Sequence, residues 1–567
     1  MLQGDVGVEL GRRVAVALRT ALGVEITPAE ALVRPSTREG VDYQCNVAMS
    51  LAKTLKKAPR EVAQAVVEHL DSADLVEAPE IAGPGFVNLV LRREWLEEQA
   101  AGLLGDDRLG VATTEAPRRV AIDLSSPNVA KEMHVGHLRS SIIGDAIMRL
   151  LRFAGHEVIP HNHLGDWGTP FGMLIEHLVD EGWKAGSEAH SISDLNGFYV
   201  AARKKFDADP DFVERARLRV VALQGGDEET LALWRGLVEE STRHFEKVYE
   251  LLGIGLTSED IYGESFYNPF LADTVAELEA KGLTEVSDGA LCVFPPGFSN
   301  REGDRLPLII RKSDGGYNYA STDLATIRYW IGEREVTDLL YVVGTPQSQH
   351  FTMVSAAARQ AGWLTDQHAE HVGFGSILGP DGKMFRSRSG DSIPLAELLD
   401  EAVDRAAALT GDPAVAEAVG VGAIKYADLS SDRLSDYVFD WDRMLALTGN
   451  TGPYLQYAYA RIRSLFDRAG DVAPGVFTVG EPAERALALE LLAFEPVLEQ
   501  VAETLEFHRL AVYLHGVAAA FSTFYERCPV LKAPPGVRAS RLALCDRTAR
   551  TLREGLSLLG IATPERM

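Results

Sequence analysis

The sequence predicts a multidomain α/β protein whose central domain is built on a parallel, Rossmann-like sheet. The chain has 567 residues, more than one hydrophobic core normally serves. Residues 120–124, 157–161 and 337–343 are short apolar runs, typical of buried strands, and helical periodicity over 138–151 links the first two. From residue 446 onward the pattern is helical, which predicts an all-α C-terminal region.

Composition is that of a soluble globular chain. Hydrophobic residues make up 46% and charged residues 24% of the sequence, a balance that excludes a disordered protein. No apolar run approaches the ~20 residues that cross a bilayer, and the N-terminus does not resemble a secretory signal. The four cysteines form no C-x-x-C pair. We therefore expect a cytoplasmic protein with neither disulfides, nor zinc, nor a membrane partner.

The formal charge of −26 argues against nucleic-acid binding over the whole surface, because phosphates are contacted by Lys and Arg. Binding nevertheless needs only one basic face. We therefore expect a charge-segregated surface, with the acidic excess outside any nucleic-acid contact.

Residues 1–112 are predicted to form a small α+β domain, because helical and extended patterns alternate there. Residues 14–22 and 42–55 have helical periodicity, and a Gly-Pro-Gly turn precedes a strand that ends near Leu91. Further along, residues 180–260 read as a charged helical insertion in the central domain.

The stretch VAIDLSSPNVAKEMHVGHLRSSII, residues 120–143, joins the first predicted strand to its helix. Ser-Ser-Pro-Asn breaks the strand, so His134, Gly136 and His137 fall at the helix start, where backbone N–H groups attract anions. Gly136 permits close approach to the backbone, and two imidazoles add donors for phosphate oxygens. The alternative is that both histidines merely end a loop.

Polar residues stand at the ends of later elements. Glu264 lies in a turn before a helix, and Tyr319 and Asp323 share a helical face. Gln347 follows the strand at 337–343, on the edge where parallel sheets bind ligands. Both carboxylates also have a structural explanation, since the helix dipole favours acids in a first turn. A further strand is expected at 371–378.

The segment GPDGKMFRSRSG, residues 379–390, places Lys383, Arg386 and Arg388 among glycines. This predicts a basic loop, for which a solvated turn is the alternative. His161 and His163 share one face if their segment is extended. No Cys or carboxylate set accompanies them, so we expect no metal there.

Tyr454, Tyr457 and Arg461 lie on one stripe of a predicted helix. A core stripe is the default explanation of this spacing, but tyrosine rings beside an arginine also suit unstacked RNA bases. Phe86 offers a stacking face and Asn88 a hydrogen-bonding edge to RNA, although Phe86 fits a core equally well.

The string SSPNVAKEMHVGHLRSSIIGDA resembles the arginyl-tRNA synthetase version of the HIGH motif of class I aminoacyl-tRNA synthetases. The strings PGFVN, GDWGT-FG and YGES-YNP and a DALR-type C-terminal segment resemble the same family, so the resemblance covers nearly the whole chain. The basic loop occupies the KMSKS position. There Lys383, Met384 and Ser387 match, whereas Phe385 and Arg386 replace Ser and Lys.

The resemblance implies an arginine–tRNA ligase with four parts. These are a tRNA-contacting domain at 1–112, a catalytic domain at 113–390, a helical connector at 391–445 and a helical anticodon-binding domain at 446–567.

The resemblance also implies roles for individual residues. Lys131 would compensate for the altered loop. Glu264 and Asp323 would hold the guanidinium of arginine, with Tyr319 and Gln347 lining its pocket, and Ser126, Asn128 and His134 would hold its α-amino and carboxylate end. The implied catalytic residues are His134, His137, Lys131, Lys383 and Arg386. The implied ATP contacts are His134, Val135, Gly136, His137, Lys383 and Met384, and the implied tRNA contacts are Phe86, Asn88, Tyr454, Tyr457 and Arg461.

By the same resemblance, ATP with Mg²⁺ activates arginine to arginyl-adenylate, and a ribose hydroxyl at the tRNA 3′ end then takes up the arginyl group. It further implies that tRNA binds before activation and that the protein is a monomer. One alternative is a cysteinyl or glutamyl enzyme of the same class. Missing cysteine ligands argue against the first, and the two acids argue for a cationic substrate. A catalytically inactive RNA-binding paralogue is the alternative of another kind.

Overall fold

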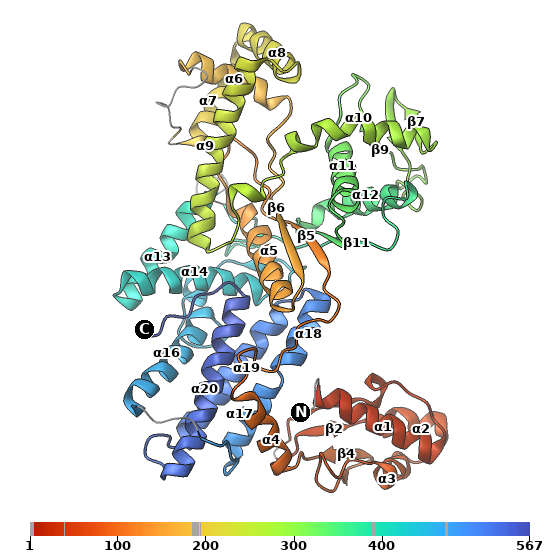
Figure 1. Cartoon of the computed structure of the whole chain (residues 1–567), viewed down its shortest axis with the longest axis vertical. Helices are drawn as coiled ribbons and strands as arrows, with labels where there is room; N and C mark the ends of the chain where they lie inside the picture. Colours follow the sequence, from red (N-terminus) through yellow and green to blue (C-terminus); the bar gives the residue numbers. More distant parts are fainter. Residues whose placement is uncertain (1–4, 39, 184–191, 193, 387–392, 471–474) are drawn as a thin grey trace.

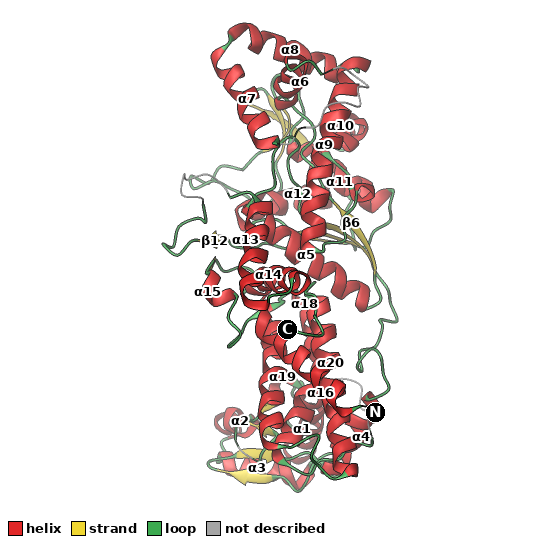
Figure 2. Ribbon diagram, turned by 90° about the vertical axis from the view of Figure 1, so that its left-hand side faces the viewer, coloured by secondary structure: helices red, strands yellow, loops and turns green. Residues whose placement is uncertain are grey.

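The computed structural model describes residues 5–38, 40–183, 192, 194–386, 393–470 and 475–567. This part of the chain is elongated (Figure 1), with a parallel sheet near the middle and an insertion of helices at one end. The N-terminal unit lies at the other end, beside the C-terminal helices. Figure 2, turned by 90°, shows that helices dominate throughout.

Four parallel strands form the central sheet, in the order β11-β10-β5-β6. β5 (Arg119–Asp123) leads through α5 (Val135–Phe153) to β6 (Glu157–His161), as the apolar runs and the periodicity predict. β10 (Asp338–Tyr341) pairs with the other side of β5, and β11 (His368–His371) pairs with β10. Because the sheet extends from β5 in both directions, ligands are expected beyond the carboxyl ends of β5 and β10.

The helix α5 is anchored by its apolar face. Leu138, Ile142, Ile147 and Leu151 are all 2% exposed or less. Burying one such side chain contributes roughly 1.5–3 kcal/mol. The residues at the start of α5 are therefore held on a rigid support.

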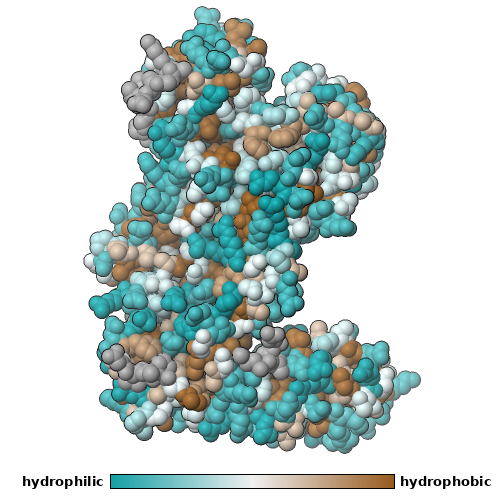
Figure 3. Space-filling view, in the orientation of Figure 1, coloured by the Kyte–Doolittle hydropathy of each residue, from teal (hydrophilic) through white to brown (hydrophobic). Residues whose placement is uncertain are grey.

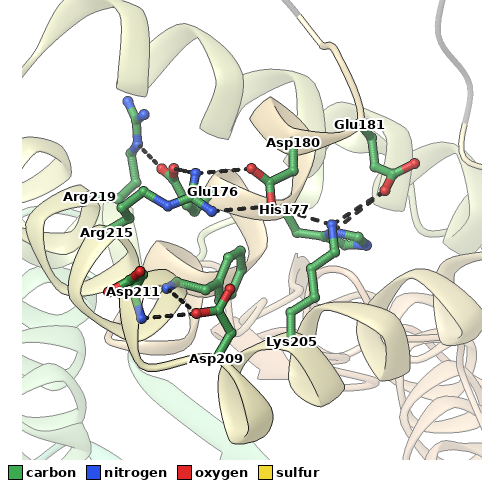
Figure 4. Close-up of polar contacts among 10 residues, drawn as sticks. Glu176, His177, Asp180, Glu181, Lys205, Asp209, Asp211, Arg215 and Arg219 are labelled. Carbon is green, nitrogen blue, oxygen red and sulfur yellow. Dashed lines mark hydrogen bonds and ion pairs between the residues drawn. The ribbon is translucent and has the colours of Figure 1, made fainter.

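The insertion is fastened by ion pairs. The buried carboxylate of Glu176 on α6 accepts hydrogen bonds from Arg215 and Arg219 of α8, both at 3.0 Å (Figure 4). Lys205 of α7 reaches Asp180 of α6 at 3.3 Å. These contacts join α6 to both neighbours. The insertion's helices are α6 (Pro170–Asp180), α7 (Leu195–Ala208), α8 (Pro210–Gln224) and α9 (Glu228–Leu252).

A second apolar core packs helices around a small antiparallel sheet, β7-β8-β9. The helix that follows β9 is predicted from the sequence, whereas β7 and β8 are not. Each has only four residues, and the inner two residues of β7 are exposed. The elements are η2 (Ser258–Asp260), α10 (Glu264–Ala280), β7 (Thr284–Ser287), β8 (Ala290–Val293), β9 (Leu308–Arg311), α11 (Tyr319–Gly332), η3 (Thr345–Gln347) and α12 (Ser348–Gln360).

The predicted strand at 371–378 is wrong as a single element. β11 ends at His371, and β12 (Ile377–Leu378) instead pairs in parallel with β13 (Tyr437–Val438). Between them a Cβ on Gly375 would lie 2.6 Å from the carbonyl oxygen of Ser435. The two backbones therefore meet where only glycine fits, and the chain changes sheet at this point.

The N-terminal unit packs helices on the antiparallel sheet β1-β2-β4-β3. The helical prediction for 42–55 is wrong at its start, because Tyr43–Cys45 form a strand that pairs with both β1 and β4. The elements are α1 (Val6–Leu22), η1 (Ala29–Ala31), β1 (Val33–Pro35), β2 (Tyr43–Cys45), α2 (Val47–Leu55), α3 (Pro59–His69), β3 (Glu80–Ala82), β4 (Phe86–Leu89) and α4 (Arg93–Leu103).

The rest of the chain is helical apart from β13. No helix in the described ranges is long and apolar enough to cross a membrane. The helices are α13 (Leu395–Thr410), α14 (Pro413–Leu429), α15 (Trp441–Met444), α16 (Gly452–Ala469), α17 (Pro482–Leu492), α18 (Phe494–Thr504), α19 (His508–Arg527) and α20 (Pro535–Leu558).

The N-terminal unit is fastened to the C-terminal helices. Arg485 of α17 pairs with the buried carboxylate of Asp42 and donates to the Leu91 carbonyl at 2.7 Å. Above this junction the surface is hollowed into a broad concavity with a largely hydrophilic wall (Figure 3).

Candidate active site

Two histidines cap the start of α5. His134 is the N-cap residue, and its Nδ1 accepts a hydrogen bond from the Gly136 backbone N–H at 3.0 Å. The Nδ1 of His137 accepts from the His134 backbone N–H at 3.1 Å, and the ring centroids are 4.2 Å apart. Imidazoles thus do the work that Ser, Thr, Asp or Asn usually does at this position.

Both rings are neutral at physiological pH. Burial lowers the pKa of His134, and burial together with the neighbouring His134 lowers the pKa of His137 to about 3. Since each Nδ1 accepts a hydrogen bond, the ring proton must sit on Nε2. Each histidine therefore presents one N–H donor and no charge beside the helix N-terminus.

A cavity of about 190 Å³ lies between the start of α5 and the basic turn. Of the residues predicted to contact ATP or act in catalysis, the cavity is lined by His134, Val135, Gly136, Met384 and Arg386. Its opposite wall comes from the segment that leads from β11 into the first residue of β12, Phe374 to Ile377. The structure thus brings together two sequence motifs that are far apart in the chain.

The described part of the basic loop, here called the basic turn, is anchored where it meets β12. Met384 bridges to Leu378, and the Phe385 N–H donates to the Ile377 carbonyl at 3.0 Å. The Phe385 ring stacks on Phe439, with centroids 4.6 Å apart. The side chain of Lys383 is exposed. Arg388 and Ser387 lie outside the described residues.

Lys131 stands before the two histidines on an exposed turn. Its ammonium lies 4.5 Å from the ring centroid of Tyr199, on α7. The insertion therefore holds the predicted catalytic lysine through a cation–π contact.

Three carboxylates lie close enough beyond the strand ends to affect one another's charge, and we call this group the acidic pocket. Asp123 is the last residue of β5, Glu264 the first of α10, and Asp323 lies on α11. Burial raises the pKa of Asp123 and of Glu264 to about 6, and the charge of Asp323 adds to both rises, while His163 opposes them. A buried acidic pocket of this kind favours a cation.

Hydrogen bonds tie this pocket to the turn before the histidines. The Ser126 hydroxyl donates to Asp123 at 2.7 Å, and the Ser126 N–H donates to Asn162 at 3.1 Å. The Glu264 N–H in turn donates to the Leu164 carbonyl at 3.0 Å. The acidic pocket is therefore hydrogen-bonded to the turn that leads from β5 to the start of α5.

The turn itself is strained. Ser125, Ser126 and Ala130 have φ values of 67°, 49° and 62°, which L-residues other than glycine rarely adopt. Such strain concentrates at functional sites. Asn128 is exposed on this turn, and a Cβ on Gly165 would lie 2.2 Å from its Oδ1, so Gly165 leaves room for it.

His350 connects Tyr319 to Asp323 of the acidic pocket. The Asp323 carboxylate meets the Nε2 of His350 at 2.6 Å, and the Tyr319 ring lies 5.0 Å from the His350 ring. Gln347 ends η3, immediately before the helix that carries His350, and its side chain is exposed. Tyr319 is therefore linked to the acidic pocket through His350, and Gln347 lies three residues before His350 in the chain.

Sequence reasoning missed Asp123 and His350, and it considered His163 only as a metal ligand. Asp123 ends an apolar run, which is a weak signal for a strand end. His350 follows Gln347 by three residues, and its link to Asp323 comes only from the fold.

The residues predicted to contact RNA differ in how much of each side chain is exposed. Asn88 is 3% exposed, and its Oδ1 accepts from Gln44 at 3.0 Å, so its side chain has no edge free for RNA. Phe86, on the same strand, is partly exposed.

On α16, Tyr457 is 43% exposed. Arg461 stacks over the Tyr525 ring at 4.2 Å, and Tyr454 packs toward α19, where its hydroxyl is 3.4 Å from Ser522. This stripe is thus a surface of rings and a guanidinium, and only part of it faces the core.

His161 is buried in a polar cluster. Its Nε2 lies 3.2 Å from the Tyr267 hydroxyl and 3.3 Å from the Nδ1 of His163. In the part of the chain that the structure describes, no group of three or more His, Cys, Asp or Glu side chains is placed to hold a metal ion.

Comparison with known proteins agrees with this geometry. The family described as "tRNA synthetases class I (R), catalytic domain" matches residues 99–441, more than half of the chain. An arginyl-tRNA synthetase N-terminal domain matches residues 9–91, and a DALR anticodon-binding domain matches residues 455–567. The catalytic domain is therefore that of a class I aminoacyl-tRNA synthetase.

Individual relatives narrow the class. The arginine–tRNA ligase of Thermobifida fusca is 54% identical, with 98% of this chain and 99% of that protein covered, and that of Frankia casuarinae is 52% identical, with 96% of each covered. Among solved structures, the Plasmodium falciparum arginyl-tRNA synthetase has a TM-score of 0.85 at 28% identity over 100% of both chains. The Thermus thermophilus enzyme has a TM-score of 0.77 at 27% identity, covering 99% and 100%. This chain belongs to the arginyl-tRNA synthetase family.

Proposed function

We propose that this chain is an arginine–tRNA ligase, which activates arginine with ATP and transfers it to the 3′ end of its tRNA. The observation that carries the proposal is the joining of two sites: an acidic pocket for a cation, and a cavity at a helix N-terminus that suits a nucleotide's phosphates. The turn between β5 and α5 joins the two along the chain: its Ser126 is hydrogen-bonded to Asp123 of the acidic pocket, and His134 at its end lines the cavity.

Glu264 and Asp323 hold the guanidinium of arginine in this proposal. A guanidinium has five donors and a permanent charge, so it needs acceptors and carboxylates. Tyr319 and Gln347 line the outer part of the pocket. Each charge-assisted bond contributes ~1.5–3 kcal/mol, and lysine, which lacks the planar fork, should be discriminated against.

The other end of the amino acid meets the turn that follows β5. Ser126, Asn128 and His134 hold the α-amino and carboxylate groups. We add Asp123 to this set, because its buried carboxylate bonds to Ser126 and is coupled to Asp323. The arginine carboxylate then faces the nucleotide cavity.

In the first step, the arginine carboxylate attacks the α-phosphorus of ATP and pyrophosphate leaves. The protein's task is to align the reactants and to stabilise the developing charge. His134 and His137 donate Nε2–H groups to phosphate oxygens, with Val135, Gly136 and Met384 against the nucleotide. Lys131, Lys383 and Arg386 neutralise the departing pyrophosphate. Mg²⁺ enters with ATP and supplies further phosphate charge compensation.

In the second step, a ribose hydroxyl of the tRNA 3′ end attacks the adenylate. We propose that residues 446–567 bind the anticodon through Tyr454, Tyr457 and Arg461, and that residues 1–112 contact the tRNA through Phe86. Residues 113–390 catalyse the reaction, and 391–445 connect the domains. We further propose a cytoplasmic monomer that activates arginine only with tRNA bound. Asn88 is left out because its side chain is buried.

Arginine-dependent ATP–pyrophosphate exchange, measured with and without tRNA, tests the proposal. Exchange should require arginine and the matching tRNA, and lysine should not replace arginine. If the protein binds tRNA but arginine supports no exchange, it is an RNA-binding paralogue and not a ligase.

A further inference from the structure

Arg139 is a buried cation at the nucleotide end of α5. It follows His134 on that helix, its side chain is 2% exposed, and it lines the cavity that His134 also lines. No role is given to it in the steps above. An arginine in this position needs a physical explanation, because charges are rarely buried without a specific purpose.

Several elements meet at this guanidinium. Its Nε lies 3.2 Å from the Asp428 carboxylate on α14, and one Nη donates to the Ser435 carbonyl at 3.1 Å. The ring centroids of Tyr437 and Phe374 lie 5.3 and 5.7 Å from its central carbon. The other Nη is buried and has no hydrogen-bond partner.

These partners lead directly to the basic turn. Tyr437 of β13 pairs with Ile377 of β12, and the Ile377 carbonyl accepts from the Phe385 N–H at the base of the turn. Phe374, which also contacts the guanidinium, lines the cavity itself. Arg139 thus lies one strand pairing away from the segment that carries Lys383 and Arg386.

The buried ion pair of Arg139 and Asp428 is better explained by the orientation of its neighbours than by a gain in folding stability. A buried ion pair is often no more stabilising than a well-packed apolar pair, because desolvation offsets the attraction. An arginine fork, however, makes directional bonds that fix the relative placement of its partners. Here the fixed elements are α5, α14 and the β12–β13 ladder, of which α5 and β12 contribute residues to the lining of the nucleotide cavity.

We propose that Arg139 is a positioning residue for adenylate formation: it holds the β12–β13 ladder, and through it the Lys383–Arg386 turn, in register with His134 across the cavity. The inference rests on the proposed function and adds a residue whose role is to align two walls of the nucleotide site.

The variant Arg139→Lys keeps a cation beside Asp428 but loses the fork. In ATP–pyrophosphate exchange with arginine and tRNA, kcat/KM for ATP should fall on the order of 10-fold or more, since small misalignments cost this much. KM for arginine should stay within about twofold, because the acidic pocket lies on other elements. Trypsin should cleave after Lys383 faster than in the wild type.

A double variant, Arg139→Met with Asp428→Val, removes both charges and leaves no unpaired ion. It should unfold within a few degrees of the wild type yet show the same loss in ATP kinetics. The matched control is Arg152→Lys, an exposed arginine on the same helix, which should leave exchange unchanged.

Three outcomes decide the matter. ATP kinetics within about twofold of wild type in folded Arg139→Lys and in the double variant would overturn the proposal. A parallel fall in ATP and arginine kinetics that follows the fraction of folded protein would also overturn it, since Arg139 would then be purely structural. Absence of exchange in the wild type would instead overturn the proposed function, and the role of Arg139 with it.

Discussion

Replacing Asp323 by asparagine separates the charge of the proposed arginine pocket from its shape. The side chain of Asp323 is 16% exposed, so solvent screens it little, and the amide oxygen of asparagine can still accept from His350. The lost interaction is one charge-assisted bond to the guanidinium, ~1.5–3 kcal/mol. KM for arginine should therefore rise on the order of 10- to 150-fold, at 1.4 kcal/mol for each factor of ten.

The assay is ATP–pyrophosphate exchange at saturating tRNA, with arginine varied at high ATP and then ATP at high arginine. KM for ATP should stay within about twofold, because Asp323 does not line the nucleotide cavity. Asp366→Asn, an exposed loop residue, is the matched control. An unchanged arginine KM in a variant that unfolds at the wild-type temperature would refute the assignment of the pocket.

Three further predictions follow from the same geometry. The pKa values of Asp123 and Glu264 lie near 6, so both acids are ionised above that pH and take up protons below it. KM for arginine should thus rise severalfold from pH 7 to pH 5, and Glu264→Gln should flatten the profile. Because both pKa values are higher in the folded protein than in the unfolded chain, the folded protein takes up protons first as the pH falls, so these two groups should make the fold more stable at pH 5 than at pH 7. A flat profile in the wild type would contradict the pocket. Lys131→Ala should lower kcat for activation more than it raises KM for arginine, and the reverse pattern would make Lys131 structural. Glu176→Gln should lower the stability of the insertion by ~1–3 kcal/mol, less than for a fully buried pair because Arg215 is half-exposed. Thermal unfolding measures this, and an unchanged melting temperature would show that the contacts in Figure 4 contribute nothing.

The parts of the fold that follow from the sequence are those in which apolar residues recur at a regular spacing. One pattern dominates in each of three segments: the apolar runs at 120–124 and 157–161, and the helix face through Leu138 and Leu151. All three elements form as expected. The change of sheet at Gly375 could not be predicted, because it depends on the approach of a distant backbone at Ser435. The same limit hides β7, which is too short and too exposed to carry a pattern.

For the site, the sequence shows which polar residues stand at the ends of helices and strands, but it does not show which of them meet in the folded protein. Glu264 and Asp323 can be proposed from their positions, but their coupling to Asp123 appears only when β5, α10 and α11 converge. Asn88 illustrates the reverse case. Its strand has both faces covered at that point, and a two-residue period cannot reveal this.

The ion pair between Arg485 and Asp42 has a consequence for how the protein would distinguish RNAs of different length. This link makes the N-terminal unit move with α17, so the two ends of the concavity in Figure 3 keep a set separation. A minihelix that reaches only the catalytic domain would contact one side of the concavity, whereas a full-length, L-shaped RNA would contact the N-terminal unit as well. Loosening the link with Arg485→Met should therefore narrow the difference in affinity between the two RNAs.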